Sequence, residues 1–245
     1  MVQSKPARSG HRPHPQTLAG LLDSAKEFLG KTAPPKGDFD PQGAWTQTFA
    51  VWLIGRGAQG GRIILKRAPL ANQSGRFGLS VDWQFRQLSD FVHRVRADLV
   101  CQEDLLATPV SWQSESCICQ QDKSLPQTAG KRQGDAAALD KGLTGRPWTS
   151  NFSLLEAVQR LGNRQIQPID FTMLEFLDVR KDDQRLLFAG RQEVDLPGGR
   201  STLTGYCHTG TGVLPEVYWL DDRQRLRFIQ TALRAFIAVG QEVQP

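Results

Sequence analysis

The sequence predicts a mainly β protein: a large curved antiparallel sheet, half-barrel or sandwich-like, with one or two helices packed on it. Two long stretches, Phe77–Phe85 and Phe91–Cys101, alternate between apolar and polar residues with the period of two that a strand produces. Between residues 199 and 239, four shorter runs are separated by glycine or aspartate clusters, as in an antiparallel meander. Strands of nine to eleven residues exceed the usual length of about 5 to 6, which favours a broad, strongly curved sheet.

Residues 1–43 are predicted to form a basic tail with a short helix and a linker. The stretch Pro34–Gly37 reads as the linker, and Gly30 stands where the helix would end. We expect this helix to dock on the sheet, with binding to a partner as the alternative. Its apolar residues, which recur at helical spacing, are Leu18, Leu21, Leu22, Ala25, Phe28 and Leu29.

Residues 44–240 are predicted to form a single antiparallel β domain. Its first strand, Phe49–Ile54, enters a hairpin with the glycine-rich loop 55–61. This loop is not a phosphate-binding loop, because no Gly-Lys-Ser/Thr closes it and two strands flank it. After the two long strands, a further strand is expected at Val110–Cys119.

Residues 120–147 lose all periodicity, and we expect a flexible excursion that is disordered or forms a mobile flap. A helix is then predicted at 152–161, with Ser150 or Asn151 as its N-cap and Gly162 at its end. Lying between two groups of strands, this helix is expected to cross the apolar face of the sheet and close the core.

The second group of strands begins near Phe171 and ends in the meander. Each meander strand has one apolar face, so one side of the sheet covers a core and the other meets water or a partner. Pro215 cannot donate a ladder hydrogen bond. We therefore expect its strand at a sheet edge, or a bulge at that point.

The amino-acid composition limits the classes of protein to which the chain can belong. The chain has 245 residues, 39% hydrophobic and 22% charged, so most of it should fold into a sizeable core. Its charge of +5 comes without a recognised nucleic-acid-reading module, and no nucleic-acid partner is expected.

No apolar run approaches the roughly 18 residues of a transmembrane segment. No signal-peptide core lies between Met1 and Thr17, so the protein is expected in the cytoplasm, or in the periplasm or secreted if a signal peptide has been removed.

Four cysteines are present, and a disulfide could join two of them: Cys101, Cys117, Cys119 and Cys207. Cys101 and Cys207 fall on apolar strand faces, where small core residues are the simplest interpretation. Cys117 and Cys119 have one residue between them, too few for a zinc hook. We expect no metal and no cofactor.

The sequence indicates a binding protein rather than an enzyme. Cys207 and His208 are the only adjacent Cys–His pair, and neighbours on a strand point to opposite faces. Neither Gly-x-Ser-x-Gly nor His-Glu-x-x-His occurs. Tyr206, His208 and Tyr218 are expected on the face opposite Cys207 and Trp219. They form either a polar-aromatic patch for a ligand such as a glycan, or ordinary surface aromatics.

The order of elements resembles the half-barrel layout of bacterial lipoprotein-carrier proteins and of uncharacterised exported families near them. The resemblance rests on the strands at 77–85 and 91–101, the helix at 152–161, and the corner Tyr218–Asp222 with the strands after it, and it covers most of residues 44–240. It implies a curved sheet that wraps a helix and can hold acyl chains. The leading hypothesis is a non-catalytic binder or carrier of apolar ligands or envelope components. The alternatives are a structural or interaction protein of the cell envelope, and a hydrolase with an unrecognised site.

Overall fold

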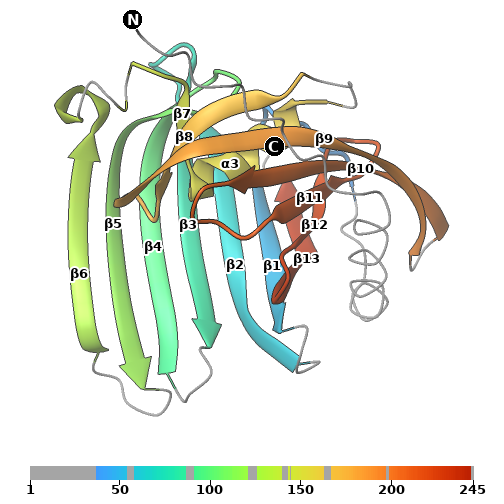
Figure 1. Ribbon diagram of the computed structural model, residues 1–245, viewed down its shortest axis with the longest axis horizontal. Coiled ribbons are helices and arrows are strands. Elements are labelled where there is room, and N and C mark those ends of the chain that lie inside the picture. Colours follow the sequence, from blue (N-terminus) through green and yellow to red (C-terminus); the bar gives the residue numbers. More distant parts are fainter. Residues whose placement is uncertain are drawn as a thin grey trace, which may run out of the picture.

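The computed structural model describes residues 37–53, 58–86, 91–120, 126–139, 143, 145–162, 167–196 and 199–243. These residues form one curved, unclosed sheet of 13 strands, with helix α3 (Asn151–Arg160) on its inner side (Figure 1). The expected fold class, a large curved antiparallel sheet with a helix packed on it, is confirmed. The short helix expected at 18–29 lies outside the described residues.

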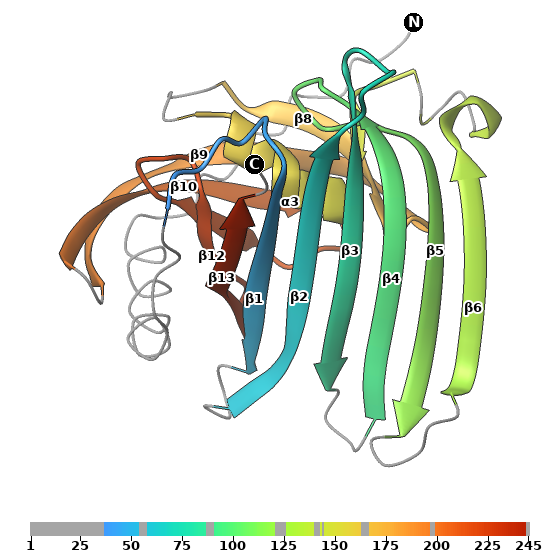
Figure 2. The same cartoon turned by 180° about the vertical axis from the view of Figure 1, so that it is seen from behind.

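The first group of strands makes a wall of long, neighbouring strands, seen in front of the helix in Figure 2. Each pairs antiparallel with the next along the chain. The long alternating stretches of the sequence form the third and fourth strands, as expected. The strands are β1 (Trp45–Leu53), β2 (Ala58–Pro69), β3 (Arg76–Arg86), β4 (Phe91–Gln102), β5 (Pro109–Gln120) and β6 (Pro126–Asp135).

The second group begins with the short strand β7 (Trp148–Ser150), which pairs parallel with the strand that follows α3. All later pairings are antiparallel, and the last strand pairs with β1, so that Trp45 lies opposite Val243 and Leu53 opposite Arg234. This pairing joins the two groups into one sheet. The later strands are β8 (Ile169–Glu175), β9 (Val179–Leu196), β10 (Gly199–Gly210), β11 (Glu216–Leu220), β12 (Leu226–Gln230) and β13 (Arg234–Val243).

The end strands of the sheet, β6 and β7, do not pair with each other. Hydrogen bonds instead join β7 to the connection between β4 and β5. The Thr108 hydroxyl donates to the Trp148 carbonyl at 3.0 Å, and the Thr149 hydroxyl donates to the Leu106 carbonyl at 2.7 Å. The rings of Trp112 and Trp148 meet edge to face, 6.2 Å between centroids. Side chains therefore bring β7 against the first group without a ladder of backbone hydrogen bonds.

Helix α3 begins and ends as its sequence predicts. Ser150 is the N-cap: its hydroxyl accepts from the Ser153 N–H at 3.0 Å, and the Ser153 hydroxyl accepts from the Ser150 N–H at 3.0 Å. This reciprocal pair is a capping box. Gly162 follows the helix with φ of +71°, the left-handed conformation that glycine adopts at least cost. The helix is almost entirely buried, and its apolar residues join the main core inside the sheet.

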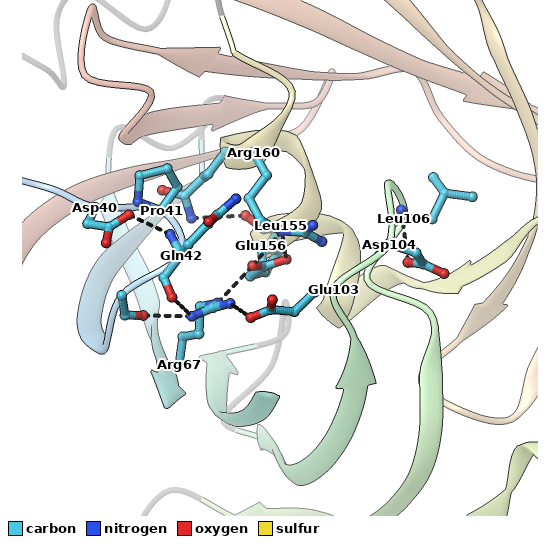
Figure 3. Close-up of polar contacts among 12 residues, drawn as sticks. Asp40, Pro41, Gln42, Arg67, Glu103, Asp104, Leu106, Leu155, Glu156 and Arg160 are labelled. Atoms are coloured by element: carbon cyan, nitrogen blue, oxygen red, sulfur yellow. Dashed lines mark hydrogen bonds and ion pairs between the residues drawn. The ribbon is translucent and has the colours of Figure 1, made fainter. Parts of the chain in front are cut away.

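Because α3 is buried, its polar side chains need partners inside the fold. Arg67 of β2, fully buried, donates from Nε to Glu156 Oε1 at 3.0 Å and from Nη2 to Glu103 Oε1 at 2.9 Å (Figure 3). Its Nη1 donates to the carbonyls of Gln42 and Gly43. Arg160 donates from Nε to Glu156, the nearer oxygen lying at 2.8 Å. Glu156, also fully buried, is thus held between two guanidinium groups.

A second buried pair continues this network along the helix. The Gln47 and Gln159 side-chain amides exchange two hydrogen bonds, of 3.0 and 3.1 Å. Gln159 Oε1 also accepts from the Leu226 N–H at 2.9 Å. The C-terminal half of α3 is therefore fixed to β1, β2 and β12 by hydrogen bonds as well as by packing.

Two expectations about individual strands need correction. The stretch 120–147, expected as a flexible excursion, contains β6 and the 3-10 helix η2 (Ala136–Ala138). Sequence periodicity missed β6 because it is an end strand whose described side chains, from Ala129 onward, are mostly exposed, so no apolar face alternates. Pro215 precedes β11 rather than interrupting it, and β11 lies inside the sheet between β10 and β12.

Opposite the main core, the last strands carry a smaller apolar cluster that includes Cys207, Trp219 and Phe228, all buried. Trp219 and Phe228 stack with ring centroids 5.8 Å apart. Both faces of this part of the sheet are therefore covered. In the described part of the chain, no helix has the length and apolar character needed to cross a bilayer.

We predict that replacing Glu156 by Gln destabilises the protein by about 3–5 kcal/mol, because Arg160 loses the carboxylate that it contacts and the buried Arg67 keeps only Glu103. Urea unfolding followed by circular dichroism measures this loss. Glu115→Gln is the matched control, since Glu115 pairs with Lys131 on the exposed surface, where ion pairs contribute little. Equal unfolding midpoints for the two variants would contradict the role given to Glu156.

Candidate functional site

A cavity of about 390 Å³ lies inside the sheet at the N-terminal half of α3. Asn151 and Leu155 of the helix border it, together with residues of β2, β3, β8 and the last strands. Ten of its 17 lining residues are apolar: Ile63, Trp83, Leu155, Met173, Phe176, Val213, Leu214, Ile229, Leu233 and Phe236. Its volume falls within the roughly 300–1,000 Å³ of small-molecule sites.

Aromatic rings form one wall of the cavity, with Trp83 at the centre. Its ring centroid lies 5.5 Å from that of Phe176 and 5.8 Å from that of Phe236, the latter in an edge-to-face arrangement. Phe152 of α3 packs behind, 6.0 Å from Trp83 and 5.8 Å from Phe176. Because these rings contact one another, the wall is held in place before any ligand arrives.

Two hydrogen-bond donors belong to residues that line the cavity near its aromatic wall. Within the described residues, neither donates to a carboxylate or a carbonyl group. The indole Nε1 of Trp83 is buried and has no acceptor there. Arg234 places its guanidinium over the Phe85 ring, 4.6 Å from the centroid, and makes no ion pair within the described part of the chain. Burial lowers the pKa of Arg234, although a guanidinium stays charged at neutral pH. An anion on a ligand would pair with the Arg234 guanidinium, which borders the cavity.

Carboxylates line another part of the cavity. Glu175 pairs with Lys181 at 3.3 Å. Glu216 accepts a hydrogen bond from the Tyr218 hydroxyl. Burial raises the pKa of Glu216, and repulsion by Glu175 adds to the rise, while the hydrogen bond from Tyr218 opposes it. Glu216 therefore takes up a proton at a higher pH than a free glutamate does.

The three residues predicted to bind a ligand, Tyr206, His208 and Tyr218, do share a face opposite Cys207 and Trp219. That face points inward, and all three are buried rather than on the surface. Only His208 borders the cavity; its Nε2 lies 2.9 Å from Gln184 Oε1. Tyr206 donates its hydroxyl proton to the Gly162 carbonyl, and Tyr218 donates to Glu216. Both tyrosine hydroxyls therefore donate to acceptors within the protein, and a role of the two tyrosines in ligand binding stays a prediction.

Cys207 and His208 lie on opposite faces, as expected from strand geometry, so they do not form a nucleophile–base pair. Cys101 and Cys207 are buried thiols in different apolar clusters. Cys117 and Cys119 are partly exposed and close to each other. Within the residues described, no three His, Cys, Asp or Glu side chains gather in a metal-binding arrangement.

A second hollow, of about 530 Å³, runs along β4, β5 and β6 and is broadly open to solvent. Polar side chains occupy much of its lining, among them Asp98, Gln113, Gln133 and Asp135. The inner cavity is smaller but more enclosed and more apolar, and the cationic Arg234 borders it. We therefore take the inner cavity as the candidate site.

Sequence reasoning missed most of this cavity. Trp83 was visible as an inward residue, because it belongs to the apolar side of the alternating stretch Phe77–Phe85. Arg234 and Glu216 gave no such signal, since a charged residue in a strand is ordinarily assigned to the solvent face. The β11–β12–β13 ladder brings them near each other, since Val217 lies opposite Gln230 and Gln230 opposite Ala235. The pairing of β13 with β1 then joins these strands to the group that carries Trp83.

Comparison with known proteins supports the fold alone. No family model matches the chain, and neither does any curated protein. Among solved structures, the chain is similar to a beta-barrel-like protein from Brucella abortus, described as a domain of unknown function, DUF1849. The match has a TM-score of 0.54 at 9% identity, and it covers 83% of this chain and 98% of that one. It shows a β-barrel-like fold for most of the chain.

We predict that His208 makes folding sensitive to acid. Burial lowers its pKa from 6.5 to about 4. Between these values the unfolded chain binds a proton that the folded chain does not, so stability falls as pH falls from 6.5 to 4, by about 3 kcal/mol in total. His208→Gln, which keeps a donor for Gln184, should remove that part of the loss. Urea unfolding across this range measures it, and parallel pH profiles for the two proteins would overturn the assignment.

Proposed function

We propose that the protein is a non-catalytic binder or carrier of a small amphipathic molecule, an acyl chain with a polar head group, held in the cavity inside the sheet. The observation that carries the proposal is the cavity itself: about 390 Å³, mostly apolar, with a few polar groups at defined places. Ligand sites of this kind use apolar contact for affinity and a small number of polar groups for orientation.

The border of the cavity supports an entrance for an apolar chain. Leu214 and Leu233 line it and are 57% and 64% exposed. Large apolar side chains this exposed are unremarkable singly, but these two share one cavity with the rings of Trp83 and Phe236. A chain passing between them would cover apolar surface that is otherwise in water, at about 25 cal/mol for each Å².

The position of Arg234 supports an anion in the head group. Arg234 borders the cavity and lies over the Phe85 ring, 4.6 Å from its centroid. A carboxylate or phosphate placed beside Arg234 would form a charge-assisted hydrogen bond with its guanidinium.

The layout agrees with this proposal. The long strands, the enclosed helix and the following meander resemble the lipoprotein carriers, in which such a sheet can hold acyl chains. Here the helix fills one part of the interior and leaves the cavity beside its N-terminal half. A ligand would occupy a defined hollow rather than the whole interior.

We predict that Leu233→Asn weakens the binding of a long-chain fatty acid by about fivefold to tenfold, which corresponds to losing part of a leucine's apolar contact. Titration calorimetry with wild type and variant measures the change. Leu105→Asn is the matched control, because Leu105 is 56% exposed and lies away from the cavity. If fatty acid fails to bind wild type, or if both variants bind like wild type, this cavity is not the binding site.

A further inference from the structure

Cys117 and Cys119 form a pair of neighbouring thiols on strand β5. Two residues apart on one strand, they share a face, and their Sγ atoms lie 3.4 Å apart. Arg94 of β4 lies directly opposite Cys117 in the ladder, on the face that carries the exposed Arg96. Both cysteines are therefore on the outer face of the sheet and partly exposed.

The pair differs from the other two cysteines. Cys101 and Cys207 are almost completely buried, with 0% and 1% exposure. Burial raises the pKa of Cys207 to about 11 and that of Cys101 well above its usual value, so neither presents a thiolate at neutral pH. Partial burial and the contact with Cys119 also raise the pKa of Cys117, but Arg94 and Arg96 oppose the rise.

We propose that Cys117 and Cys119 are a reversible thiol–disulfide pair that exchanges with low-molecular-weight disulfides such as glutathione disulfide. The inference does not depend on the proposed ligand site, which lies on the inner face. It rests on the short distance between the two sulfurs and on their shared exposed face.

The exchange proceeds in two balanced steps. One thiolate of the pair attacks a sulfur of glutathione disulfide, which forms a protein–glutathione mixed disulfide and releases one glutathione. The second thiolate then attacks the protein sulfur of that bond and releases the other glutathione. The two cysteines lose two electrons and two protons, and glutathione disulfide gains both to become two thiols.

Strand geometry favours a reversible bond over a permanent one. Residues two apart on a strand have Cα atoms about 6.6–6.8 Å apart, at the upper end of the range that a disulfide spans. The ladder has a register shift between Ile118 and Cys119, where the strand can bend to bring the sulfurs together. A strained and exposed disulfide of this kind is reduced readily.

The test uses the full chain, reduced and then incubated with glutathione disulfide, quenched in acid and mapped by mass spectrometry after alkylation. We expect Cys117 and Cys119 to be joined, with the loss of two hydrogens, and Cys101 and Cys207 to be alkylated only after unfolding. The rate should rise with pH as the thiolates form, and excess reduced glutathione should restore both thiols.

Two single variants separate the two steps. Cys119→Ser should accumulate one stable glutathione on Cys117, because no second thiol resolves it, and Cys117→Ser should do the same at Cys119. Wild type should carry little of this adduct. Four free thiols in wild type after incubation, adducts that persist in wild type, or disulfides only between chains would each overturn the proposal.

Discussion

The buried contact between Arg67 and Glu156 is the interaction on which the arrangement of this molecule depends. A curved sheet whose end strands do not pair needs something to fill its inner side, and α3 does so with a helix that is almost entirely buried. A buried carboxylate is tolerated only with charged and hydrogen-bonded partners. Arg67 and Arg160 supply them at the C-terminal half of the helix, and the paired amides of Gln47 and Gln159 add uncharged hydrogen bonds beside them. Such a network favours one position of the helix over others that would pack equally well.

Fixing one half of α3 in this way leaves room beside the other half. The cavity borders Asn151 and Leu155 in the N-terminal half, whereas Glu156, Gln159 and Arg160 engage the sheet further along. Its aromatic wall is already assembled from Trp83, Phe176 and Phe236, so little conformational entropy would be lost when a ligand enters. The arrangement suits an apolar ligand that is held in one orientation by few polar contacts.

The sequence predicted much of the fold because its strands alternate and its turns carry glycine or aspartate. Phe77–Phe85, Phe91–Cys101 and the meander after Gly199 were visible for this reason, and so was the capped helix between Ser150 and Gly162. Strand β6 was not visible, because it is an exposed end strand without an apolar face.

The residues of the candidate site could be predicted from the sequence only in part. Alternation predicted that Tyr206, His208 and Tyr218 share a face. It did not predict that this face points inward, which depends on the curvature of the sheet and on the pairing of β13 with β1.

The central claim is that the hollow beside α3 holds an amphipathic ligand, and native mass spectrometry of the protein purified under mild conditions tests it most directly. The account predicts a bound molecule in one-to-one amount, released by denaturing extraction and identified as a fatty acid or another single-chain lipid, or such a complex when these molecules are offered to the empty protein. A bare mass that persists in the presence of excess acyl chains would contradict the account, and the cavity would then have to be regarded as a packing defect of the core rather than a binding site.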